Sequence, residues 1–141
     1  MAASSISSME HPNGQAFATI AFDRSGVAVV QFRPKVMLCR AVISTVMQLP
    51  VENSTRACAT IVVIPEDTEC DMDLIAVDHY ADHGLAHRTE AVAFVCHELG
   101  LVPMLRLYFA HHPVPFPVTF CTTVEEARTW MRAREGRGLV A

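Results

Sequence analysis

Residues 58–64 read CATIVVI and residues 91–96 read AVAFVC, and these two stretches decide the fold. Both are continuous apolar runs, without the alternation of apolar and polar residues that marks a strand with one wet face. A strand that is covered on both faces has this composition, and such strands occur in parallel sheets flanked by helices. Pro65 bounds the first run. The two runs therefore predict buried strands of an α/β sheet.

Three further strands are expected in the same sheet. Residues 17–22 and 27–32 have strand composition, and the polar cluster 23–26 between them ends in glycine, which is typical of a hairpin turn. Residues 113–117 hold three prolines in alternation, which excludes regular structure there. Residues 118–121 then predict a short last strand.

An unusually apolar helix is expected over residues 36–49. Polar Arg40, Ser44 and Gln48 recur every four residues and leave only a narrow polar stripe, and Pro50 is expected to end the helix. One sheet face covers a helix stripe of about 100°, so the remaining apolar surface needs a second cover. We expect this helix to form a homodimer interface or to close an apolar cleft.

Three more helices complete the pattern. Residues 71–87 and 103–110 predict the second and third helices. Thr123 and Glu126 have the spacing of a capping box, which begins the last helix. The order strand, strand, helix, strand, helix, strand, helix, strand, helix (β-β-α-β-α-β-α-β-α) predicts an α/β domain. Its single mixed, mostly parallel five-stranded sheet is expected to be flanked by about four helices.

Length and composition agree with one such domain. The chain has 141 residues, of which 51% are hydrophobic and 18% charged, which excludes a largely disordered chain. We expect the domain over 15–134, a flexible arm over 1–14 and a tail over 135–141. The chain has no run of about 18 apolar residues, so no transmembrane segment is predicted. Residues 1–11 lack the basic and apolar regions of a secretory signal, so a cytoplasmic location is expected.

Charge and motifs argue against several classes of function. The net charge of −4 argues against nucleic-acid binding. The chain lacks G-x-G-x-x-G, G-x-x-x-x-G-K-[ST] and G-x-S-x-G, which mark nucleotide sites and hydrolase nucleophiles. We therefore expect no cofactor and no enzyme activity. Ten of the eleven basic residues are arginine, which suggests a GC-rich bacterial gene.

The five cysteines predict free thiols. Their odd number and the lack of C-x-x-C spacing argue against a disulfide framework. Cys39, Cys58, Cys96 and Cys121 lie in apolar runs and are expected to be buried. Cys70 is left out of this set because it lies in an acidic segment.

Histidines form the most conspicuous polar pattern. His79, His83 and His87 are spaced at i, i+4 and i+8 of the helix expected over 71–87. His79 and His83 have the spacing of a helical Zn²⁺ pair, but the outer two histidines would lie about 12 Å apart along the axis. No H-E-x-x-H glutamate is present. A solvated His-rich face is the alternative to a metal site, and we favour it.

A second candidate site lies in the third helix and the loop that follows. Arg106 lies between leucines, so it either contacts an anionic group or extends its charged end to water or a carboxylate. The segment 104–109 and the proline-rich loop 114–117 are candidates to line an apolar cleft, or else to form core and lid. The candidate ligand- or partner-binding residues are Arg106, Tyr108, Met104 and Phe116.

The second half of the chain carries a family resemblance. The strand at 91–95, the helix with Arg106-Leu107-Tyr108 and the closing helix VEEARTWM at 124–131 are its motifs. Together they resemble small bacterial SpoIIAA-like proteins of the STAS type. The resemblance implies a mixed sheet flanked by helices and a non-catalytic regulatory or ligand-binding module. The segment 65–70 lacks the Ser-Gly of the family's phosphorylated turn, and its Thr68 lies among acidic residues.

The resemblance and the residue patterns leave three functions open. The first is a non-catalytic regulatory or interaction module, whose partner is a second copy of the chain or another regulatory protein. The second is a binder of a small apolar or lipidic ligand, or a membrane-peripheral protein, because CRAL-TRIO-like lipid-binding domains have a related architecture. A metal-dependent enzyme that uses His79 and His83 is the third. An enclosed apolar cavity under the helix of Arg106 would favour the second.

Overall fold

The computed structural model describes residues 17–96 and 100–140, with side chains as far as residue 134. The arm expected over 1–14 lies outside the described residues. Five strands form one sheet in the order β1-β2-β3-β4-β5, in which β1 is antiparallel to β2 and the other neighbours are parallel. The strands are β1 (Ala18–Phe22), β2 (Ala28–Phe32), β3 (Cys58–Val63), β4 (Thr89–Val95) and β5 (Val118–Cys121). This mixed, mostly parallel sheet confirms the α/β fold class.

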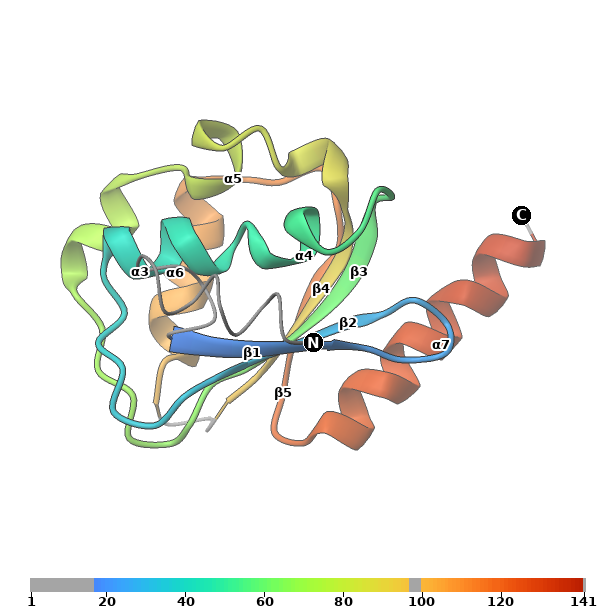
Figure 1. Cartoon of the computed structure of the whole chain (residues 1–141), viewed down its shortest axis with the longest axis horizontal. Helices are drawn as coiled ribbons and strands as arrows, with labels where there is room; N and C mark the ends of the chain where they lie inside the picture. Colours follow the sequence, from blue (N-terminus) through green and yellow to red (C-terminus); the bar gives the residue numbers. More distant parts are fainter. Residues whose placement is uncertain (1–16, 97–99, 141) are drawn as a thin grey trace.

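Helices cover both faces of the sheet, but unequally. In Figure 1, α3, α4 and α5 lie above the strands, and α7 runs below them. Right-handed connections between successive parallel strands place their helices on a single face, and α7, which follows the last strand, is free to cover the other. The helices are α3 (Arg40–Val46), α4 (Leu49–Glu52), α5 (His79–Asp82), α6 (Val102–His111) and α7 (Val124–Val140), with the 3-10 helices η1 (Met72–Ala76) and η2 (Ala86–Arg88).

Two hydrophobic cores explain why the central strands are apolar on both sides. Val92 and Phe94 of β4 belong to a core that also includes Val42 and Val46 of α3. Partly buried side chains of α6 pack against this core. Ala93 of β4 and Ile61 of β3 are both 0% exposed and belong to the core between the sheet and α7. Successive side chains of a strand point to opposite faces, so an unbroken apolar run is needed when both faces are buried.

The apolar helix expected over 36–49 is shorter and is broken in two. Leu38 instead forms an isolated parallel bridge with Cys70, and α3 begins two residues later. Pro50 does not end this helix but lies in the first turn of α4. Proline is tolerated in a first turn because its missing N–H has no intrahelical partner there.

The helix expected over 71–87 is replaced by η1, α5 and η2. Asp71 and Asp78 each accept a hydrogen bond from a backbone N–H two or three residues ahead, at 3.0 and 3.1 Å. Short aspartate side chains favour such caps over a helix interior, so each begins a new short segment. Gly84, with φ at +62°, ends α5. His79, His83 and His87 therefore do not share one helix face.

The last helix begins as the sequence predicts. The Thr123 hydroxyl accepts a hydrogen bond from Glu126 N–H at 3.1 Å, and the Glu126 carboxylate accepts one from Thr123 N–H at 3.2 Å. This reciprocal pair is the expected capping box. The backbone of α7 stays helical to Val140, so it includes most of the segment 135–141 that we expected to be a tail. Residues 132–135 are good helix formers, and the helix continues beyond them although Gly136 and Gly138 are poor ones.

All five cysteines are free, as expected. Cys58 and Cys96 are buried, which confirms the prediction for these two thiols. Cys39 and Cys121 are only partly buried, so the prediction of full burial is wrong for them. Cys39 is the N-cap of α3, and Cys121 lies in the edge strand β5, whose residues are all only partly buried.

Candidate functional site

An apolar cavity lies between the sheet and the helices of its upper face. It has a volume of about 140 Å³. An apolar cavity of about 150 Å³ in another protein stays dry and takes up benzene, so this space is large enough for a small hydrocarbon. Its wall includes apolar side chains from two strands and two helices, among them Ile43, Val46, Val62, Val92, Leu105 and Phe109.

Apolar side chains of α3 and of the residue after it line this cavity. Val46 is buried at 4% exposure, and Ile43 and Met47 are partly buried beside it. All three line the cavity. In this region, therefore, the second cover that this helix requires lies inside the same molecule, at an apolar cleft that is partly open rather than closed.

His79 and Tyr108 fix α5 onto α6 beside the cavity. The backbone N–H of His79 donates to the Tyr108 hydroxyl at 2.9 Å, and His79 Nε2 lies 3.1 Å from the Leu74 carbonyl oxygen. Burial lowers the pKa of His79 below its ordinary 6.5, so the ring is neutral at pH 7. Burial also raises the pKa of Tyr108 to about 12. Both groups thus hold the fold together in their neutral forms.

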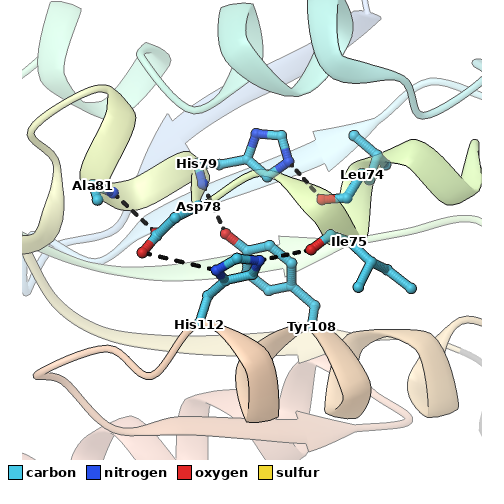
Figure 2. Close-up of polar contacts among 7 residues, drawn as sticks. All are labelled: Leu74, Ile75, Asp78, His79, Ala81, Tyr108 and His112. Atoms are coloured by element: carbon cyan, nitrogen blue, oxygen red, sulfur yellow. Dashed lines mark hydrogen bonds and ion pairs between the residues drawn. The ribbon is translucent and has the colours of Figure 1, made fainter.

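His112, just after α6, makes a second set of contacts with the same connection. Its Nε2 lies 2.6 Å from the Ile75 carbonyl oxygen, and its Nδ1 lies 4.0 Å from Asp78 Oδ2. Figure 2 shows these contacts next to the Tyr108 hydroxyl, with the Asp78 carboxylate also capping Ala81. The polar groups here bind backbone atoms of η1 and α5, and so they hold this connection against the end of α6.

Arg88 also lines the cavity, at the end of η2. Its Nη2 donates a hydrogen bond of 2.8 Å to the Ser54 carbonyl oxygen, which lies just beyond α4. Its Nε is buried and has no hydrogen-bond partner in the part of the chain that the structure describes. Buried polar atoms are satisfied in the great majority of cases, so this N–H is an exception on a cavity wall.

The residues singled out from the sequence are not gathered in one place. Met104 and Tyr108 line the cavity. Phe116 is buried in the same core, where Tyr80 meets its ring edge-on at 5.0 Å. Arg106 lies outside, with its guanidinium carbon 4.8 Å from the centre of the Phe120 ring. This cation–π contact satisfies the charge at the surface and accounts for an arginine among leucines.

His79 and His83 show no arrangement suited to a metal. One ring nitrogen of His79 is bonded to a backbone carbonyl, and His83 is the C-cap of α5. Among the described residues, no three His, Cys, Asp or Glu side chains are grouped so that they could hold an ion. None of the helices within residues 17–96 and 100–134 has the length and apolar character needed to cross a membrane.

Sequence reasoning missed the cavity residues Arg88, Val62 and Leu85. Arg88 lies in an ordinary polar stretch before a strand, and nothing in its spacing marks it. Val62 lies in the apolar run 58–64 and Leu85 in the helix expected over 71–87, and apolar residues there indicate a packed core rather than a cavity wall. Comparison of the chain with protein-family models, curated proteins and solved structures found no match.

Proposed function

We propose that this protein is a non-catalytic binding domain that holds a small, mainly apolar ligand between its sheet and the helices α3 and α6. The observation that carries the proposal is the apolar cavity of about 140 Å³ beneath α6. A well-packed domain has few internal spaces larger than a water molecule. A space of this size lowers stability unless something compensates, and a bound hydrocarbon restores the lost contacts.

The wall chemistry supports an apolar ligand rather than a polar substrate. His79 Nε2 lies against a carbonyl oxygen, and the Thr89 hydroxyl donates to the Leu85 carbonyl oxygen at 2.9 Å. These polar side chains are thus occupied by the protein itself. Burying apolar surface contributes about 25 cal/mol per Å², which suffices for binding without many hydrogen bonds.

The titratable groups near the cavity support a binding role over catalysis. Asp78 and His112 are 4.0 Å apart, beyond hydrogen-bond distance, and His112 Nε2 already meets the Ile75 carbonyl. A general base must reach the proton that it removes. The neutral, backbone-bonded His79 does not meet this requirement either. A binding domain needs neither group to be reactive.

The test is the effect of toluene on unfolding and on NMR shifts. Toluene should raise the melting temperature and shift methyl signals of Val46 and Val62, because a ligand that binds only the folded state stabilises it. Val46→Phe fills the cavity and should abolish both effects. Val63→Phe, on the α7 side of the sheet, is the matched control and should keep them. Toluene shifts that are unchanged in Val46→Phe would refute the proposal.

A SpoIIAA-like module that binds proteins is the second candidate. It is favoured by two exposed methionines, Met37 at 47% and Met72 at 63%, near the bridge that joins Leu38 to Cys70. Flexible methionine side chains are common on surfaces that accept partners. A mixed sheet flanked by helices is also the architecture that the family resemblance implies. Sedimentation of the wild type and of Met37→Glu tests whether a second copy of the chain is the partner. A wild-type dimer that Met37→Glu dissociates would support this candidate.

A further inference from the structure

One cationic side chain on the cavity wall has unused hydrogen-bonding capacity. Arg88 donates one hydrogen bond to the Ser54 carbonyl oxygen, and its Nε–H is buried without a partner among the described residues. A guanidinium has five N–H donors in a planar fork and stays charged at any physiological pH. At least one N–H donor of a permanently charged group on the cavity wall is therefore without an acceptor among the described residues.

No carboxylate of the described residues neutralises this charge. The ion pairs found there join Arg128 with Asp23 and His112 with Asp78, and Arg88 takes part in neither. The other cavity-lining groups bring no negative charge, because they are apolar side chains, hydroxyls, thiols and the neutral His79. A partly buried charge in such surroundings is costly unless it is paired.

We propose that the ligand of this cavity is a small carboxylic acid. Its carboxylate would accept hydrogen bonds from the Arg88 guanidinium, and its apolar body, of about the size of benzene, would fill the space under α3 and α6. The inference deepens the proposed function and rests on it. It adds the chemical class of the ligand and the residue that selects it.

Charge and shape favour a carboxylate over other anions. The planar fork of an arginine matches the two oxygens of a carboxylate, which it can bind through two parallel hydrogen bonds. A single positive charge balances a single negative charge. A phosphate group carries up to two negative charges at pH 7, and the second would be left unpaired against the apolar wall.

The experiment compares two probes of nearly equal shape, benzoate and toluene. Each is titrated by NMR into the wild type, Arg88→Met and Arg106→Met. The Arg88→Met change keeps the length and apolar stem of the side chain but removes its charge. Arg106→Met removes an equivalent charge outside the cavity, over Phe120, and is the matched control. Benzoate should bind at least about tenfold more weakly to Arg88→Met than to the wild type, and equally well to Arg106→Met.

Toluene separates the failure of this inference from the failure of the proposed function. It should bind the wild type and Arg88→Met within about twofold, since it carries no charge for Arg88 to meet. Equal benzoate affinities in these two proteins, with toluene bound to both, would overturn the carboxylate inference alone. Absence of toluene binding to the wild type would overturn the proposed function as well.

A comparison within the wild type keeps the test decisive if Arg88→Met does not fold. Benzyl alcohol has nearly the size of benzoate and can also hydrogen-bond, but it has no charge. Benzoate should bind the wild type at least about tenfold more tightly than benzyl alcohol, since charge-assisted hydrogen bonds are about twice as strong as neutral ones. Equal affinities would overturn the inference.

Discussion

The hydroxyl of Tyr108 in α6 accepts a hydrogen bond of 2.9 Å from the backbone N–H of His79, the first residue of α5. The side-chain rings of these two residues also stack, with their centres 5.7 Å apart. Both side chains line the apolar cavity, so this contact joins two parts of its wall that are 29 residues apart in the sequence. It is the clearest single link between the stability of the fold and the candidate site.

Tyr108→Phe should destabilise the protein. The change removes the acceptor of a buried backbone N–H, and an unsatisfied buried donor costs about 1–3 kcal/mol. Urea unfolding followed by circular dichroism measures the loss. Tyr80→Phe is the control, because no hydrogen bond of the Tyr80 hydroxyl is found among the described residues. Equal stability of Tyr108→Phe and Tyr80→Phe would show that the hydrogen bond contributes nothing.

Folding stability should fall in mildly acidic solution because of His79. Burial lowers the folded-state pKa of this side chain below 6.5. The unfolded chain therefore binds a proton more readily, so the contribution of His79 is complete above pH 6.5 and is lost as the pH falls toward the folded-state pKa. Unfolding at a series of pH values from 7.5 to 5, compared between wild type and His79→Gln, measures it. The exposed His87→Gln should retain the wild-type slope, and a wild-type slope in His79→Gln would contradict the assignment.

Thr123→Ala should weaken the start of α7. The hydroxyl of Thr123 accepts from Glu126 N–H at 3.1 Å, and loss of an N-cap side chain costs about 1 kcal/mol. Thr123→Ser, which keeps the hydroxyl, should retain most of the stability. Thermal unfolding distinguishes the two variants, and an equal loss in both would show that the threonine methyl group, not the cap, is responsible.

Cys70 should react slowly with thiol reagents although it is only partly buried. Burial, with the charge of Asp71 beside it, raises the pKa of its thiol to about 11, so little thiolate is present at pH 8. Its contact with the sulfur of Met104, at 3.1 Å, also covers it. Mass spectrometry after timed alkylation should find Cys70 labelled faster as the pH rises to 10. Cys58, which is buried, should stay unlabelled in the native protein, and rapid labelling of both at pH 8 would be inconsistent with the structure.

Glutamate at two positions of the apolar segment 36–49 should have different effects. Val46 is 4% exposed on the cavity wall, so Val46→Glu places an unpaired charge in an apolar space and should unfold the protein or abolish toluene binding. Met37 is 47% exposed, so Met37→Glu should leave the stability unchanged. If Met37→Glu converts a sedimenting dimer into a monomer, the exposed methionine is part of a homodimer interface. A monomeric wild type would remove that possibility.

Local patterns were sufficient to predict the five strands and the capping box. Each strand depends on the residue types within a short window, such as the unbroken apolar run that ends at Pro65, and on the breakers beside it. The capping box needs only Thr123 and Glu126 at the correct spacing. The alternation of strands and helices then restricts the topology, because parallel neighbours require right-handed crossovers.

The segment 71–87 shows where local patterns were insufficient. Its periodic apolar residues favour one long helix, but Asp71, Asp78 and Gly84 divide it. Each aspartate caps a backbone N–H in the folded chain. Tyr108 of α6 then binds the backbone of His79, and His112, just after α6, binds that of Ile75. Contacts over such sequence distances override a weak helical preference.

The sequence by itself determined the sheet and where its strands lie, while only the tertiary structure decided the cavity and its charge. The wall brings together Ile43, Arg88 and Phe109, which come from three separate connections. Whether side chains of α3 and α6 meet above the sheet or leave a space depends on their shapes and on the packing of the helices, which periodicity does not encode. The unpaired Nε of Arg88 likewise depends on which acceptors folding brings within reach, and its residue type gives no sign of that.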